Sequence, residues 1–196
     1  MFTRDQSIYF YEQLSSWLTE ATAGRCNPSK SWFKEYQKTM WQPLYETIGV
    51  VSKKGTKSSI DKDFLDMVVY DGPVYRLQHY YPRYKGHVWE TEYCQSWSKN
   101  TRSLSTVNGY YGEVLLIVGK AIHGISTFGL LEFLSEVLPF KTSESLERYR
   151  EEQEIAHPML FDRIEEIVII DTKHLCSWEL HKKLLPKEKW KRKAIN

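Results

Sequence analysis

Hydrophobic residues recur every three or four positions over the first part of the chain. Between Asp5 and Gly24 these positions are Ile8, Tyr11, Leu14, Leu18 and Ala21. The spacing predicts a helix that buries one face, with Asp5 as its cap and Gly24 close to its end. A segment with the same period begins after Ser29 and carries Trp32, Phe33, Tyr36, Met40 and Trp41. The chain is therefore expected to begin with two amphipathic helices.

The pattern changes after residue 48. Residues 49–59 are rich in Gly, Ser and Lys, which predicts an exposed loop, and a short helix over 59–67 is expected to follow. Beyond it, β-prone runs dominate, and the first two are separated by the turn signal Asp71-Gly72-Pro73. The expected extended segments are 67–70, 74–77, 87–98, 113–119, 124–128, 153–156 and 164–170.

This succession of helices and then strands is typical of the α+β class. One short helix, over residues 130–138, interrupts the strands before Pro139. We expect a helical lead-in over residues 1–58, packed on a core over residues 59–196 that ends in a basic tail.

Composition narrows the class of protein. The chain has 196 residues, of which 41% are hydrophobic and 27% charged, as in an ordinary globular domain. Its net charge of +2 is too small to indicate nucleic-acid binding by itself. The longest aliphatic runs, 114–118 and 167–170, are too short to span a bilayer, and no secretory signal pattern is present. These features predict no membrane contact and a cytoplasmic location.

Neither cysteines nor histidines indicate a metal centre. The three cysteines are widely spaced and form no CxxC pair, which argues against a zinc site or a disulfide framework. His174 and His181 lie two helical turns apart without a nearby third ligand, so no metal is expected. The basic tail over residues 182–193 is either a solvated terminus or a contact for nucleic acid or an acidic partner.

Three short segments carry the residue types of one reaction. Arg76 ends a β-prone run, Ser96 and Ser98 follow it, and Glu152 and Glu154 come later in the chain. A guanidinium is the preferred fork for phosphate oxygens, although an arginine in a strand also forms ordinary salt bridges. In an extended segment both serine hydroxyls point to one face, where they can bind a ribose or orient a carboxylate.

The carboxylate pair adds the chemistry. In a strand, Glu152 and Glu154 would share one face and repel each other, unless they form a solvated acidic edge. Cleavage of an N-glycosidic bond builds positive charge on the ribose, which a fixed carboxylate stabilises. A second carboxylate can deprotonate the incoming nucleophile.

In this order the segments resemble the signature of the arginine–serine–glutamate class of mono-ADP-ribosyltransferases. That class includes bacterial toxins, phage proteins that modify the host, and animal ectoenzymes. The matching segments are Val74-Tyr75-Arg76, Ser96-Trp97-Ser98 and Glu152-Gln153-Glu154-Ile155. The resemblance covers residues 67–171 and implies an ADP-ribosyltransferase-like split β-sandwich. It also implies NAD as the substrate and a macromolecular acceptor, first of all an arginine of a protein.

The resemblance assigns roles to the first two segments. Arg76 would hold the NAD phosphate and the nicotinamide-side ribose. Ser96 would support that ribose and the catalytic carboxylate, and Ser98 would support the strand geometry. Tyr75 and Trp97 complete the expected NAD-binding set, although alternation along the strand places the Trp97 indole in the core, opposite the serines.

The third segment would carry the catalytic steps. By the same resemblance, Glu154 is the catalytic glutamate and Glu152 positions the acceptor. The chain departs from the family pattern at Leu77, where a glycine commonly follows the arginine, at Trp97 and in the helix after the serines, where Leu104 and Val107 replace an Ala-x-x-Phe-like face.

Two alternatives stay open. An NAD glycohydrolase of the same fold needs the same carboxylate, with water as the acceptor. A non-enzymatic module would use the aromatic helices and the basic tail to bind protein or nucleic acid. The module predicts that Arg76 and Glu154 lie far apart or that Glu154 is exposed with no pocket. The transferase predicts that both line one cleft, with Ser96 between them and a ring such as Tyr75, Tyr80, Tyr81 or Trp89 near the base or the nicotinamide.

Overall fold

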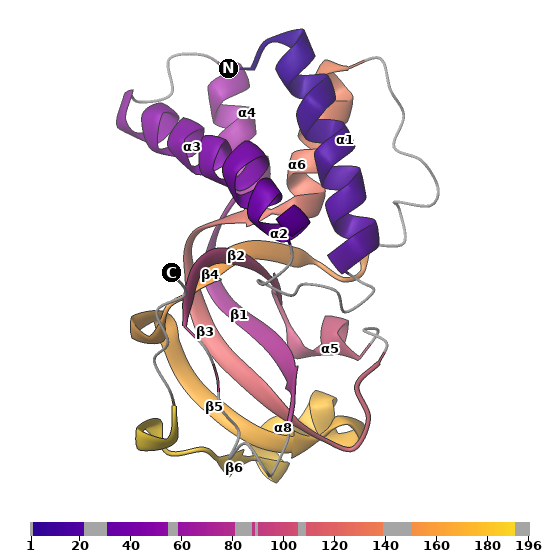
Figure 1. Cartoon of the computed structure of the whole chain (residues 1–196), viewed down its shortest axis with the longest axis vertical. Coiled ribbons are helices and arrows are strands. Elements are labelled where there is room, and N and C mark those ends of the chain that lie inside the picture. The colour runs from indigo at the N-terminus through magenta and orange to yellow at the C-terminus, as the bar shows by residue number, and fades with distance from the viewer. Residues whose placement is uncertain are drawn as a thin grey trace.

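The computed structural model describes residues 2–21, 31–54, 59–80, 88, 90–105, 109–138 and 150–190. It is an α+β protein, as the sequence predicts, with helices gathered at one end and a curved sheet at the other (Figure 1). Three small elements, α5 (Thr101–Leu104), α8 (Trp178–His181) and β6 (Lys183–Leu184), lie at the strand end. Three 3-10 turns, η4 (Phe161–Arg163), η5 (Thr172–Ser177) and η6 (Lys187–Lys189), connect the C-terminal part.

The helical layer consists of the first third of the chain and one later helix. Its elements are α1 (Arg4–Ala21), α2 (Ser31–Tyr36), the π-helical turn η1 (Gln37–Trp41), α3 (Gln42–Lys54), α4 (Ser59–Val68) and α6 (Thr127–Val137). Their apolar faces form one core cluster, which includes Leu14, Trp17, Met40, Trp41, Leu44, Phe64 and Phe133. Residues Cys94, Ile125 and Ala156 of the sheet join the same cluster, so the two layers share a core.

Two expectations about the helices change. Thr3, rather than Asp5, caps α1, because Thr3 and Gln6 exchange side-chain-to-main-chain hydrogen bonds in a capping box. Helix α3 also continues through Gly49 to Lys54, where the sequence predicts a loop. Burial of Ile48 and Val51 on one face outweighs the cost of a single glycine within a helix.

The expected boundary between lead-in and core lies in residues 55–58, outside the described residues. Helices from the two sides of this boundary pack together. Helix α4 contacts α3, and α6 contacts α1. The approach of α6 to α4 depends on Gly129, where an added Cβ would lie 1.9 Å from the Met67 carbonyl oxygen. The helical layer therefore includes segments of the expected core.

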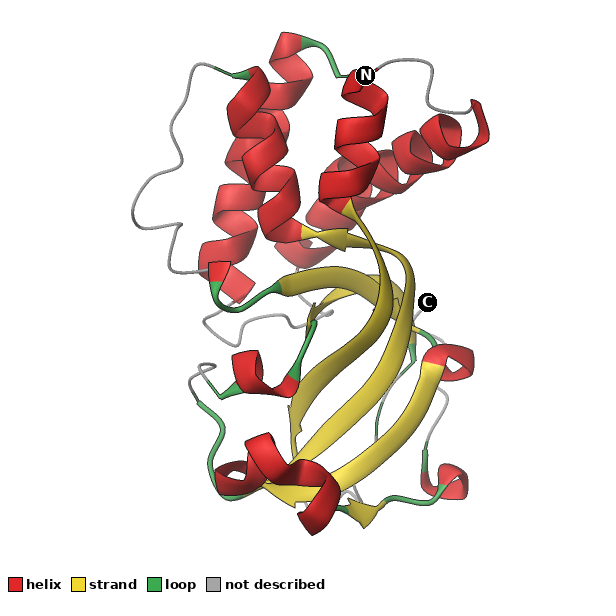
Figure 2. Ribbon diagram, turned by 180° about the vertical axis from the view of Figure 1, so that it is seen from behind, coloured by secondary structure: helices red, strands yellow, loops and turns green. Residues whose placement is uncertain are grey.

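The strands form one antiparallel system. They are β1 (Val69–His79), β2 (Thr91–Ser98), β3 (Glu113–Ser126), β4 (Glu154–Met159), β5 (Ile164–Asp171) and β6, in the order β1-β2-β4-β3-β5-β6. Because β1 also pairs with β3, the strands β1, β2, β4 and β3 form a closed circuit, whose curvature Figure 2 shows. Side chains of the sheet form two further core clusters. The second cluster includes Val74, Trp97, Ile117 and Ile155, and the third includes Leu77, Leu116 and Val168.

The circuit consists of two ladders joined by narrow seams. Strands β1, β3 and β5 pair over long stretches, and β2 pairs with β4 from Thr91–Met159 to Ser98–Glu154. The recorded pairing of β1 with β2 is the single pair Tyr75–Ser98, and β3 meets β4 at Ile125–Ala156 and Ser126–Ile155. The second ladder is thus a two-stranded unit that joins the first near one of its ends, where Ser98 pairs with Glu154.

Strands β1 and β3 are each longer than the sequence predicts. The turn signal at residues 71–73 lies within β1, where the register shifts between Tyr70 and Gly72. Opposite it, β3 runs through residues 120–123 with His123 in a left-handed conformation, φ 56°. Asp71 accepts a hydrogen bond from the main-chain N–H of His123 at 2.6 Å, so each irregularity is accommodated by the other.

Candidate active site

The backbone positions of three sequence-predicted residues are aligned where the two ladders join. Tyr75 of β1 lies opposite Ser98 of β2, and Ser98 lies opposite Glu154, the first residue of β4. Cross-strand partners share a face, so these three positions form a row across three strands. Arg76 and Ser96 flank this row, and their side chains are half-buried.

Arg76 bridges the seam between β1 and β2. Its Nη1 donates a hydrogen bond to the main-chain carbonyl oxygen of Ser96. Its positive charge also lowers the pKa of Glu154, which places the guanidinium near that carboxylate. The arginine that the sequence predicts to hold an anion therefore binds the serine strand and acts on the glutamate through its charge.

Glu154 is a buried carboxylate, with 4% of its surface exposed. Burial raises its pKa from 4.5 to about 7, against the opposing effects of hydrogen bonds from Trp17 and Ser96 and of the Arg76 charge. The Trp17 Nε1 donates to Glu154 Oε1 at 2.7 Å. This carboxyl group consequently titrates close to neutral pH, which is suited to a group that changes its charge state or stabilises charge during a reaction.

Glu152 is not part of the strand, contrary to the sequence prediction. Residues 151–153 form a turn before β4, and Gln153 adopts a left-handed conformation, φ 45°. Glu152 therefore does not share a strand face with Glu154. The turn breaks the alternation that would otherwise bring the two like charges together on one face.

The turn is fixed to the serine strand. Ser98 Oγ donates to the Glu152 carbonyl oxygen at 2.9 Å, and Lys99 N donates to the Gln153 carbonyl oxygen at 3.2 Å. Asn100 adds a hydrogen bond from Nδ2 to Gln153 Oε1 at 2.8 Å. Ser98 thus orients the backbone that carries Glu152.

Tyr75 and Trp97 point elsewhere. The ring of Tyr75 packs at the edge of the third core cluster, in a T-shaped contact with Trp178 at 6.4 Å. Trp97 is buried in the second core cluster, and its Nε1 donates to the His157 carbonyl oxygen at 2.9 Å. Trp97 therefore lies in the core, on the strand face opposite Ser96 and Ser98, as the alternation predicts.

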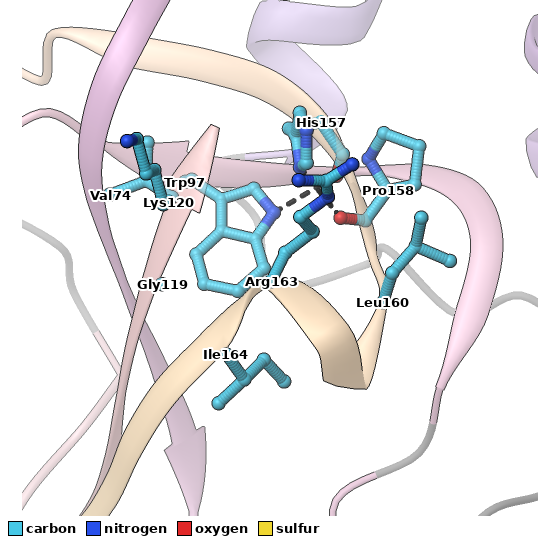
Figure 3. A pocket seen from close by; sticks show the side chains of 9 residues that line it. All are labelled: Val74, Trp97, Gly119, Lys120, His157, Pro158, Leu160, Arg163 and Ile164. Atoms are coloured by element: carbon cyan, nitrogen blue, oxygen red, sulfur yellow. Dashed lines mark hydrogen bonds between the residues drawn. The ribbon is translucent and has the colours of Figure 1, made fainter. Parts of the chain in front are cut away.

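A small hollow lies on that opposite face. It is shallow, since its volume of about 150 Å³ includes open solvent, and its walls are Val74, Trp97, Gly119, Lys120, His157, Pro158, Leu160, Arg163 and Ile164. Figure 3 shows the Arg163 side chain extending toward His157 beside the Trp97 indole. His157 accepts a hydrogen bond from Ile122 N at its Nε2, and burial lowers its pKa. None of the polar site residues Arg76, Ser96 and Glu154 lines this hollow, so it is not the cleft that the transferase predicts around them.

Trp17 is the site residue that sequence reasoning missed. The periodicity of α1 places it beside the buried positions Leu14 and Leu18, where a tryptophan is expected to be an ordinary core residue. Its contact with Glu154 joins residues 137 positions apart in the chain. No local pattern encodes such a pairing, although a buried indole N–H generally requires an acceptor.

Some of the residues considered for metal or nucleic acid have other partners, and residues 191–193 of the basic tail lie outside the described residues. His174 and His181 stack with ring centroids 3.7 Å apart, and no cluster of three metal-ligating side chains occurs among the described residues. In the basic tail, Lys182 pairs with Glu166 at 3.0 Å and with Glu179 at 2.7 Å. Within the described part of the chain, no helix is both long and apolar enough to cross a membrane.

Comparisons with known proteins give no relative. No family model matches the chain, and neither a curated protein nor a solved structure matches it.

Proposed function

We propose that this chain is a mono-ADP-ribosyltransferase that uses NAD as its substrate. The observation that carries the proposal is the environment of Glu154, a buried carboxylate that receives a hydrogen bond from Ser96 and lies near the Arg76 charge. Arginine, serine and glutamate come from three strands, as the resemblance to the arginine–serine–glutamate class requires.

The arrangement argues against a binding module in which neither Arg76 nor Glu154 takes part in a reaction. Such a module predicts that Arg76 and Glu154 lie far apart, or that Glu154 is exposed with no pocket. Instead, Glu154 is 4% exposed and the Arg76 charge reaches it. Burial of an acidic group without a compensating role costs free energy, so such groups concentrate at functional sites.

The strand arrangement supports the same proposal. The β2–β4 ladder meets the β1–β3–β5 ladder at two narrow seams. The finer fold that we propose is the split β-sandwich of ADP-ribosyltransferases, with the helical layer packed on its β2–β4 side. In this arrangement the site lies at the Tyr75–Ser98 seam, where backbone and side chains of both ladders meet.

The proposed reaction begins with cleavage of the bond between the ribose C1′ and the nicotinamide nitrogen. The bonding electron pair leaves with nicotinamide, which becomes neutral, and positive charge develops on the ribose. Ionised Glu154 stabilises this charge, and its buried setting strengthens the interaction. Arg76 holds the phosphate oxygens of NAD through charge-assisted hydrogen bonds.

The second half of the reaction forms the new bond. A nucleophile attacks C1′ and loses its proton, and in this proposal Glu152 orients the nucleophile and accepts the proton. Glu152 is partly exposed, as a residue facing a macromolecular acceptor needs to be. The acceptor that we propose first is an arginine side chain of a protein. With water in its place, the same steps give NAD hydrolysis.

Release of nicotinamide tests the proposal. Purified wild-type protein is incubated with NAD, and free nicotinamide is measured by chromatography beside Glu154→Gln and Glu165→Gln, an exposed carboxylate on β5. We expect release by the wild type and by Glu165→Gln, but not by Glu154→Gln. Equal release by all three proteins would remove Glu154 from the mechanism.

A further inference from the structure

Helix α1 reaches the candidate active site through one side chain. The Trp17 indole N–H donates to Glu154 Oε1 at 2.7 Å, and both side chains are buried. A carboxylate that accepts a hydrogen bond from a fixed donor has a defined orientation. We propose that Trp17 is a positioning residue that holds Glu154 in its working orientation, so that the N-terminal helix is part of the active site. This inference rests on the proposed function.

Trp17 is itself held rigidly. Its ring makes T-shaped contacts with Trp41 at 5.0 Å and with Tyr36 at 5.7 Å between centroids, and no part of its surface is exposed. Edge-to-face packing of this kind fixes the plane of an indole. The packing of the helical core therefore fixes the direction of the indole N–H bond, and this bond in turn orients the Glu154 carboxylate.

The helices also hold the two strands on which Ser96 and Glu154 lie. The side-chain amide of Gln37 binds both main-chain groups of Cys94, accepting from its N–H at 2.8 Å and donating to its carbonyl oxygen at 3.3 Å. Tyr45 Oη donates to the Ala156 carbonyl oxygen at 3.1 Å. Gln37 opens the π-helical turn η1, a rare conformation that occurs frequently at functional sites. Three contacts thus join the helical layer to the β2–β4 ladder.

The hydrogen bond from Trp17 favours the ionised form of Glu154. Burial opposes ionisation, while Trp17, the Ser96 hydroxyl and the Arg76 charge support it. The nearby Tyr45 and Cys94 keep their protons, because burial raises the pKa of each. Neither Tyr45 nor Cys94 therefore titrates near neutral pH, and the titration of Glu154 is separated from that of His157 on the same strand by observing the Glu154 carboxyl carbon itself.

The experiment compares Trp17→Phe with Trp41→Phe. The two tryptophans are equally buried in one cluster and touch each other, but the Trp41 Nε1 has no hydrogen-bond partner among the described residues. Both substitutions remove a similar ring volume, whereas Trp17→Phe alone removes the donor to Glu154. A second variant carries benzothienylalanine at position 17, which keeps the shape of the ring and lacks the N–H.

The first readout is the pH dependence of nicotinamide release from NAD. Because the reaction needs ionised Glu154, activity rises with pH through the pKa of that group. We expect the acidic limb to move upward by about one pH unit in both position-17 variants, with about tenfold lower activity on that limb. Trp41→Phe should keep the wild-type limb. Equal displacement in Trp41→Phe, or none at position 17, would overturn the positioning role.

The second readout needs no activity. Carbon-13 NMR of the glutamate carboxyl groups, with Glu154 assigned by its loss in Glu154→Gln, reports its titration in each variant. A raised pKa in the position-17 variants alone supports the role of Trp17. If the titration shifts in this way and the wild type releases no nicotinamide, the contact stands and the proposed function fails. An unchanged titration in an active enzyme overturns the contact alone.

Discussion

Arg76 donates from its guanidinium to the main-chain carbonyl of Ser96, and so ties β1 to β2 beside their single recorded pair, Tyr75–Ser98. At this seam one side chain binds the serine strand and lowers the pKa of Glu154 through its charge. Arg76 therefore joins two strands and also favours the ionised form of the candidate catalytic carboxyl group.

Substitution of Arg76 separates these effects. Arg76→Ala is expected to weaken NAD binding about tenfold or more, because it removes charge-assisted hydrogen bonds to phosphate. It should also raise the pKa of Glu154 further, since a nearby positive charge is lost. Arg76→Lys keeps the charge and loses the bidentate fork, so it should restore the titration more than the affinity.

Isothermal titration with NAD measures the affinity, and the carboxyl NMR titration measures the pKa. Arg102→Ala is the matched control, because Arg102 is exposed on α5. Unchanged NAD affinity in Arg76→Ala would contradict the phosphate-binding role.

Glu152 offers a test of transfer against hydrolysis. Glu152→Ala should lose most transfer to a protein acceptor and keep part of the NAD hydrolysis, because Glu154 remains in place. Glu151→Ala, an exposed neighbour in the same turn, is the control and should retain both activities. Label transfer and nicotinamide release are measured in the same reaction. Parallel loss of the two activities in Glu152→Ala would speak against a role in positioning the acceptor.

Ser98 is expected to support Glu152 indirectly. Ser98→Ala removes the hydrogen bond to the Glu152 carbonyl and should lower the free energy of unfolding by about 1 kcal/mol. It should reduce transfer more than hydrolysis, because the turn that carries Glu152 loses an anchor. Urea unfolding and the two activity assays measure these effects, with Ser105→Ala, an exposed serine, as the control. A reduction in hydrolysis alone would refute the link between Ser98 and acceptor positioning.

Stability should depend on pH through Glu154. Its pKa is about 7 in the folded protein and near 4.5 when unfolded, so the native state binds more protons between these values. The stabilisation is present below pH 4.5 and is lost as pH rises through 7. Relative to Glu154→Gln, the wild type should lose up to about 3 kcal/mol of unfolding free energy between pH 5 and pH 8.

Urea unfolding of both proteins at several pH values measures this difference. Glu165→Gln, which replaces an exposed carboxylate, should follow the wild type at each pH. Parallel pH profiles for the wild type and Glu154→Gln would show that Glu154 does not titrate with a raised pKa.

Local sequence patterns account for much of the fold. Helical periodicity locates α1, and aliphatic runs locate β5 and the first half of β3, because burial on one or two faces selects these residues directly. The turn signal at residues 71–73 is misleading, because pairing with β3 absorbs it as an irregularity within β1. Glycine likewise fails to end α3 where Ile48 and Val51 bury one face.

The site is predictable only in part, because contacts between residues distant in sequence determine several of its features. Arg76, Ser96 and Glu154 can be selected by residue type and order, and alternation places Trp97 in the core. The turn at residues 151–153 depends on anchors from Ser98, Lys99 and Asn100, which are distant in sequence. The contact of Trp17 with Glu154 depends on the packing of α1 against the sheet, which periodicity does not specify.

Label transfer from NAD tests the central claim most directly. Purified wild-type protein and Glu154→Gln are incubated with NAD labelled in its adenylate phosphate and with a bacterial lysate. The account predicts label on discrete macromolecules with the wild type and none with Glu154→Gln. Nicotinamide release without label transfer would replace the transferase by an NAD glycohydrolase. Neither label transfer nor nicotinamide release, together with no binding of NAD, would contradict the account.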